Sequence, residues 1–111
     1  MTTVVCRKTK EGFRFLCAGH AGYAEKGRDV VCAGVSALCM ALDARLQALS
    51  RGGSVKIKRR EASDGFFLLE AAGAVSESLA TVLAGLLAIG AQYPGFLRVK
   101  TDAGTKREEQ T

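Results

Sequence analysis

One stretch of the sequence, Gly19 to Leu38, holds the residues best suited to chemistry. It contains His20, the only histidine of the chain, and Cys32, with Gly22 and Gly27 in the segment between them. A cysteine attacks as its thiolate, and a nearby histidine can form an imidazolium–thiolate pair with it. The stretch is therefore compatible with a Cys–His pair for nucleophilic catalysis, with Cys32 as nucleophile and His20 as base, and also with an ordinary strand–loop–helix connection in which the two residues are near each other by chance.

The expected position of Cys32 at a helix start supports the catalytic interpretation. Asp29 is a good N-cap residue, so Cys32 falls in the first helical turn, near free N–H groups and the positive end of the helix dipole. These features favour a thiolate, and the first-turn N–H groups are candidates to hold the oxyanion formed on a scissile carbonyl. Asp29 either caps the helix only or also orients the imidazole or binds substrate; its position favours the cap. Ser36, one turn after Cys32, either donates a hydrogen bond to the site or bonds back to its own helix.

Hydrophobic periodicity predicts the elements that position these residues. The expected strands are residues 3–8, 13–20, 55–60, 66–71 and 96–101. The expected helices are residues 30–51, ending at Gly52–Gly53, and residues 76–90. Turns are expected at residues 10–12 and 62–65. The order ββαββαβ predicts an α+β fold, a two-layer α/β sandwich with about five strands in the sheet and both helices on one face.

Length and composition favour one globular domain. The chain has 111 residues, of which 48% are hydrophobic and 24% charged, which is typical of a folded protein. We expect a single domain at residues 1–101 and a frayed polar tail at residues 102–111. The longest uncharged apolar run, Leu79 to Ala91, is too short to cross a bilayer, and no signal peptide is visible. These features predict a cytoplasmic protein with no membrane association.

The four cysteines, at positions 6, 17, 32 and 39, show no metal-binding pattern. No CxxC pair occurs, and a single histidine cannot complete the usual zinc spacings, so neither a metal nor a cofactor is expected. Free thiols in a reducing compartment are the better interpretation. We expect Cys6, Cys17 and Cys39 to be core residues.

Two other functions are compatible with the residues. The net charge of +5 and the basic residues 56–60 leave open a non-enzymatic ribosome-associated or RNA-binding module, although no aromatic residues are interleaved with that run as a stacking platform needs. A redox sensor pairing Cys32 with Cys39 is the third possibility. Their seven-residue separation holds the thiols about 10 Å apart on a helix, which is too far for a disulfide.

The stretch GHAGYAEKGRDVVCAGVSAL resembles the signature of the ribosomal-processing cysteine protease family, Prp. The matching positions are Gly19–Ala21, Gly27, Asp29–Cys32 and Ser36. The chain length and the order of strands and helices also fit, so the resemblance covers essentially the whole chain.

The resemblance implies a small bacterial cysteine endopeptidase with His20 as base and Cys32 as nucleophile. The family pattern also has the aspartate and serine that fall on Asp29 and Ser36, and it places a flexible substrate loop at Ala21–Arg28. The expected loop residues are Ala21, Gly22, Tyr23 and Gly27. Family members are similar homodimers that trim a short N-terminal extension from a large-subunit ribosomal protein, cutting after paired aromatics. The implied partners are that ribosomal protein and a second copy of the chain, without a specific nucleic acid.

Overall fold

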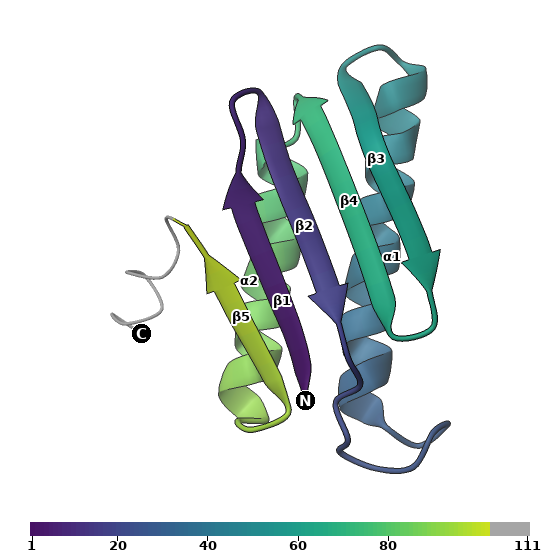
Figure 1. Cartoon of the computed structure of the whole chain (residues 1–111), viewed down its shortest axis with the longest axis vertical. Helices are drawn as coiled ribbons and strands as arrows, with labels where there is room; N and C mark the ends of the chain where they lie inside the picture. Colours follow the sequence, from purple (N-terminus) through teal and green to yellow (C-terminus); the bar gives the residue numbers. More distant parts are fainter. Residues whose placement is uncertain (103–111) are drawn as a thin grey trace.

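Two β-hairpins and a final strand form one five-stranded sheet, and two helices cover one of its faces (Figure 1). The computed structural model describes residues 1–102. The strands are β1 (Thr2–Lys8), β2 (Gly12–Ala18), β3 (Val55–Ser63), β4 (Phe66–Gly73) and β5 (Leu97–Thr101), and the helices are α1 (Val30–Arg51) and α2 (Ser76–Gln92). The predicted two-layer α+β sandwich is therefore confirmed. The predicted tail at residues 102–111 lies, beyond Asp102, outside the described residues.

The sheet brings the two hairpins side by side in the order β3-β4-β2-β1-β5. Strand β2 pairs antiparallel with both β1 and β4, whereas β1 and β5 are parallel. The β2–β4 pairing runs from Gly12 opposite Ala72 to Ala18 opposite Phe66. The end of β2 and the tip of the β3–β4 hairpin therefore lie at the same edge of the sheet, next to the start of α1 (Figure 1).

The core lies between the sheet and the helices. Phe13, Phe15 and Cys17 on β2 are buried, while Arg14 between them is exposed, as the alternation predicts. Cys6 and Cys39 are buried as well, which confirms the prediction of three core cysteines. Each fully buried Leu, Val or Phe side chain contributes about 1.5–3 kcal/mol to folding. The most completely buried side chains are Phe15, Leu42, Leu46, Leu69, Leu86, Val4 and Val31.

Strand β3 is longer than the periodicity predicts. It continues to Ser63, and the hairpin turn consists of Asp64 and Gly65 alone. The register shifts between Ile57 and Arg59, and such a bulge interrupts the alternation from which a strand is recognised. Because β3 is also an edge strand and mostly exposed, the hydrophobic pattern alone predicts that the strand ends at residue 60, which is too early.

Helix α1 is long and apolar enough to cross a membrane by length and composition. A core helix passes the same test, and Val31, Val35, Leu42 and Leu46 of α1 are buried within this fold. Their spacing places them on the side of α1 that packs against the sheet. The absence of membrane association stays a prediction.

Candidate active site

His20 lies just beyond the end of β2, beside the tip of the β3–β4 hairpin. The antiparallel pairing continues past the strands, since the N–H of Gly19 donates to the carbonyl of Gly65 at 2.8 Å. One residue further on each side, His20 Nε2 lies 4.0 Å from Asp64 Oδ2. The strand register therefore fixes which turn residues face the imidazole.

Asp29 occupies the N-cap position of α1, as predicted, and also binds the loop that connects β2 to α1 (residues 19–29, the β2–α1 loop). Its Oδ1 accepts the N–H of Cys32 at 2.9 Å, and its Oδ2 accepts those of Tyr23 at 2.9 Å and Ala24 at 3.4 Å. These backbone N–H groups, that of Cys32 above all, lower the pKa of Asp29, because they favour the charged carboxylate. Both carboxylate oxygens are thus engaged by backbone, and neither bonds to His20 in the described part of the chain.

Cys32 is partly buried in the first turn of α1. Its own N–H donates to Asp29, and the N–H of Ala33 donates to the Asp29 carbonyl at 3.0 Å. These two N–H groups are therefore engaged and not free to hold an oxyanion, although the helix start is where such donors are expected. The N-cap side chain engages the Cys32 N–H, and the first intrahelical hydrogen bond engages that of Ala33.

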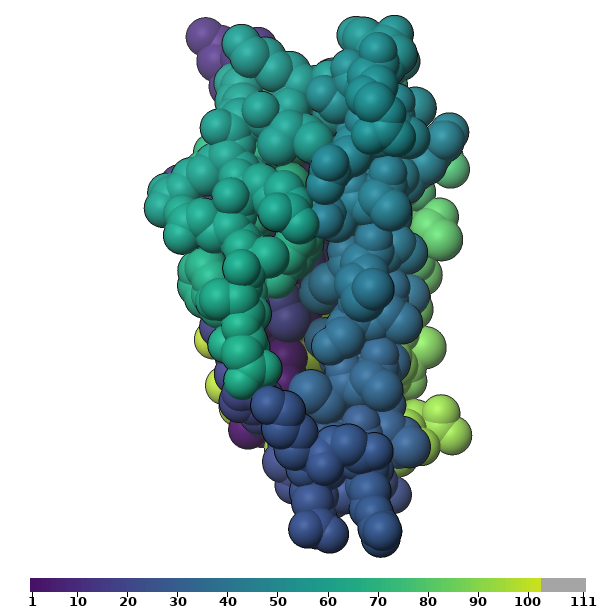
Figure 2. All heavy atoms as spheres, turned by 90° about the vertical axis from the view of Figure 1, so that its right-hand side faces the viewer, coloured from purple at the N-terminus to yellow at the C-terminus, as the bar shows by residue number. Residues whose placement is uncertain are grey.

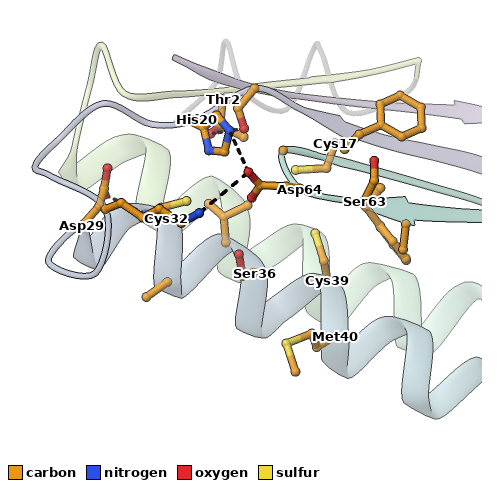
Figure 3. Close-up of a pocket in the computed structure, with 18 of the residues that line it drawn as sticks. Thr2, Cys17, His20, Asp29, Cys32, Ser36, Cys39, Met40, Ser63 and Asp64 are labelled. Atoms are coloured by element: carbon orange, nitrogen blue, oxygen red, sulfur yellow. Dashed lines mark hydrogen bonds and ion pairs between the residues drawn. The ribbon is translucent and has the colours of Figure 1, made fainter.

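His20 and Cys32 line one cavity of about 710 Å³ between α1 and the β3–β4 hairpin. Figure 2 shows the furrow between these elements, with the β2–α1 loop at its lower end. Within residues 1–102, no hydrogen bond joins the His20 imidazole to the Cys32 thiol, and the imidazole is 60% exposed. Catalytic hydrogen bonds are often long without substrate and tighten in the complex. The two side chains are thus brought to one cavity but not into a formed pair (Figure 3).

Ser36 and Cys39 extend the α1 wall of the cavity beyond Cys32. In the part of the chain that the structure describes, the Ser36 hydroxyl donates to no helix carbonyl, so it does not bond back to α1. The thiol of Cys39 interacts with that of Cys17 across the core, and this contact and burial raise the pKa of Cys39. The thiol that interacts with Cys39 is therefore that of Cys17 and not that of Cys32, which counts against a redox sensor that pairs Cys32 with Cys39.

The β2–α1 loop is anchored in its first half. Ala21 is buried, and the Tyr23 ring packs edge-to-face on Tyr93 at 5.3 Å and on Phe96 at 5.2 Å between centroids. Ala21 and Tyr23 consequently do not line the cavity. Besides Gly19, His20 and Asp29, the loop residues that line it are Gly22, Ala24, Lys26 and Gly27.

The far end of the cavity is bounded by an ion pair between Arg60 on β3 and Asp43 on α1. Arg60 Nε and Nη2 donate to the two Asp43 oxygens at 2.8 Å each. This bidentate contact lowers the pKa of the Asp43 carboxyl. Lys58 and Arg59 are also paired, with Glu11 and Glu61, so much of the basic run is neutralised and the RNA-binding alternative loses its main support.

Four charged residues at the cavity were not predicted from the sequence: Lys26, Asp43, Arg60 and Asp64. Asp64 was placed in a turn, but nothing local indicates that this turn faces His20, because that depends on strand order. Among residues 1–102, no group of His, Cys, Asp and Glu is arranged to hold a metal ion. The chemistry that the site can perform is thus that of a thiol and an imidazole at the mouth of a groove.

Comparison with other proteins decides the family. A model of the family described as cysteine protease Prp matches residues 1–98. The chain belongs to the Prp family of cysteine proteases. No curated protein sequence matches the chain.

Crystal structures of two bacterial proteins share the fold. The essential ribosomal processing protease Prp from S. aureus with a covalently linked product peptide superposes with a TM-score of 0.74 and 26% identity, covering 92% of this chain and 100% of that one. The same protease with a substrate peptide superposes with a TM-score of 0.67 and 24% sequence identity, with the same coverage. SMU.848 from Streptococcus mutans superposes with a TM-score of 0.62 and 23% sequence identity, covering 92% of this chain and 96% of that one.

Proposed function

We propose that this Prp-family protease removes a short N-terminal extension from a bacterial large-subunit ribosomal protein. The observation that carries the proposal is the shared cavity of His20 and Cys32, in a chain whose family is that of a cysteine protease. The similar S. aureus protein is named a ribosomal processing protease and holds a peptide in two crystal structures. The substrate is accordingly a peptide segment that lies along the groove between α1 and the β3–β4 hairpin.

The reaction uses the thiol of Cys32 and the imidazole of His20. His20 takes the thiol proton, and the Cys32 sulfur attacks the scissile carbonyl to form a tetrahedral intermediate. When the C–N bond breaks, the imidazolium gives its proton to the leaving amine, and a thioester joins the N-terminal fragment to Cys32. Water, activated by the neutral imidazole, then attacks the thioester and restores the thiol.

Closure of the site is part of the proposed cycle. Since the imidazole and thiol are not yet hydrogen bonded and the imidazole is largely exposed, substrate binding must bring His20 toward Cys32. The exposed second half of the β2–α1 loop, around Lys26 and Gly27, covers the substrate and excludes water.

Cleavage of a peptide that carries the N-terminal extension and its aromatic pair tests the proposal. Cys32→Ser and His20→Ala should each lower kcat/KM by about 10²–10⁴. Cys6→Ala is the matched control, because it removes a buried thiol that does not line the cavity, and it should cleave like wild type. Unchanged cleavage by either site variant would overturn the assignment.

We further propose that the enzyme is a cytoplasmic homodimer. Four free cysteines suit a reducing compartment,. The resemblance to Prp proteins supports the dimer, and Val30 and Met40 on α1 are large apolar side chains that are exposed in the single chain. Sedimentation at several concentrations tests it, and a monomer mass at all of them would contradict it.

A further inference from the structure

We propose that Asp64 is the positioning residue for His20. Its carboxylate holds the Nε2 side of the imidazole, so that Nδ1 is left to face the Cys32 thiol. Lys26 of the β2–α1 loop shares the same carboxylate, which ties the loop to the hairpin tip. The inference deepens the proposed function and rests on it.

The carboxylate of Asp64 is directed at the ring (Figure 3). Asp64 Oδ2 lies 4.0 Å from His20 Nε2 and 4.0 Å from Lys26 Nζ. All three side chains line the catalytic cavity. A single carboxylate oxygen of Asp64 thus faces both His20 and Lys26.

The backbone holds Asp64 in this place. The 2.8 Å hydrogen bond from the Gly19 N–H to the Gly65 carbonyl joins the hairpin tip to the residue before His20. Gly65 has φ of 72°, and a Cβ there would lie 2.7 Å from His20 Nε2. The imidazole therefore rests directly on the turn, and glycine both permits the turn and leaves room for the ring.

Asp29, the aspartate suspected from sequence, cannot serve this purpose in the same geometry. Its two oxygens accept backbone N–H groups of Cys32, Tyr23 and Ala24. Asp64 accepts none of these and is 76% exposed. Among residues 1–102, Asp64 is the carboxylate that pairs with the imidazole.

A carboxylate at one ring nitrogen supports catalysis at the other. It orients the ring and favours the imidazolium that accompanies the Cys32 thiolate. Because His20 and Asp64 are both exposed without substrate, water and salt screen the pair strongly. Covering the groove with substrate removes water and strengthens the same interaction. The effect should therefore be modest in magnitude but specific in its dependence on pH and salt.

The test compares Asp64→Asn and Asp64→Glu with Glu61→Gln, using peptide cleavage from pH 5 to 10. Glu61 is an exposed carboxylate of the same hairpin that pairs with Arg59 and does not line the cavity. Asp64→Asn should lower kcat about two- to fivefold with KM nearly unchanged. The alkaline limb of its pH–activity profile should also move to lower pH, because the imidazolium is no longer stabilised by the carboxylate. Asp64→Glu should restore part of kcat, and Glu61→Gln should behave like wild type.

Two further measurements separate positioning from a merely structural role. Raising the salt concentration should reduce the difference between wild type and Asp64→Asn. Lys26→Ala removes the competing cation, so its alkaline limb should move in the opposite direction, to higher pH. Equal profiles for wild type and Asp64→Asn, or an equal loss in Glu61→Gln, would overturn the proposal.

Alkylation of Cys32 by iodoacetamide distinguishes failure of this inference from failure of the proposed function. If the wild type cleaves no extension peptide, the proposed function fails, but alkylation still reports the imidazolium–thiolate pair. Near neutral pH, where loss of the carboxylate shifts the imidazolium–thiolate pair toward the neutral thiol and imidazole, Asp64→Asn should then be alkylated about two- to fivefold more slowly than wild type. Equal rates would refute the role of Asp64 whether or not the peptide is cut.

Discussion

Asp29 and Cys32 are joined by a 2.9 Å hydrogen bond in which the carboxylate accepts the backbone N–H of the candidate nucleophile. The second carboxylate oxygen accepts the N–H of Tyr23, whose ring packs on Tyr93 and Phe96. One side chain therefore begins the helix that carries Cys32 and fixes the anchored half of the β2–α1 loop. Capping and loop attachment are distinct contributions that substitution can separate.

Replacing Asp29 should destabilise the protein and impair substrate binding together. Asp29→Ala loses the cap and both loop contacts, so the thermal midpoint should fall by roughly 4–8 °C, the shift expected for one lost cap in a domain of this size. Asp29→Ser retains a cap oxygen for the Cys32 N–H but cannot also reach the loop. We therefore expect Asp29→Ser to keep most of the thermal stability while its KM rises like that of Asp29→Ala. Equal KM values for wild type and both variants would contradict a role in holding the loop.

The Asp43–Arg60 pair should make stability depend on pH in the acid range. The guanidinium hydrogen bonds lower the pKa of Asp43 in the folded state, whereas the unfolded carboxyl titrates near its ordinary value of about 3.9. The contribution is thus fully present above about pH 4 and is lost as pH falls through the lower folded value. Asp43→Asn should be less stable than wild type at pH 7, and the difference should shrink below pH 4 in urea unfolding.

The matched control for that series is Glu25→Gln, which removes an exposed carboxylate of the β2–α1 loop. Its unfolding free energy should follow that of wild type at every pH. If the unfolding free energies of Asp43→Asn and wild type differed by the same amount at pH 7 and pH 3, the stability would not depend on the ionisation of Asp43.

Cys32 should be the first cysteine to react with a thiol reagent. Cys6, Cys17 and Cys39 are buried, while Cys32 is partly exposed at the cavity. Burial, with a smaller effect of Asp102, raises the pKa of Cys6 to about 11, so little of it is thiolate at neutral pH. Mass spectrometry after brief iodoacetamide treatment should find label on Cys32 alone, and unfolding in urea should expose all four. Early label on Cys6 or Cys17 would contradict the described packing.

The features that could be predicted from sequence are local ones. The cap at Asp29, the apolar face of α1 and the inward-facing Phe13 and Phe15 each follow from residues a few positions apart. Helical and strand periodicity encode them directly. The position of Cys32 in the first turn of α1 was predictable for the same reason.

The features that could not be predicted depend on contacts between distant segments. Asp64 faces His20 because β4 lies beside β2, and no local pattern states that order. The packing of Tyr23 on Tyr93 and Phe96 is equally remote in sequence, and the resemblance to the Prp family implied only a flexible loop at Ala21–Arg28, without its anchored half. Strand pairing and loop anchoring depend on contacts between residues far apart in the sequence, which a local pattern does not encode.

Gly65→Ala should damage catalysis far more than it damages stability. Alanine at φ of 72° strains the backbone by about 1 kcal/mol, and its Cβ would meet His20 Nε2 at 2.7 Å. The imidazole is the mobile partner of that contact, so the ring should be pushed away from the turn, and from this displaced position it should no longer align with Cys32 when substrate binds. A displacement of about 1 Å at a catalytic group can lower kcat on the order of a hundredfold, which peptide cleavage would detect.

Gly53→Ala is the matched control for this substitution. Gly53 follows α1 with φ of 89°, and a Cβ there would have no neighbour within 4 Å. The backbone strain should therefore be similar, with a similar fall in thermal midpoint, while kcat stays at the wild-type value. If Gly65→Ala kept its kcat, or if Gly53→Ala lost as much, the imidazole would not depend on the hairpin turn. A selective loss in Gly65→Ala would instead show that the turn sets the position of the base.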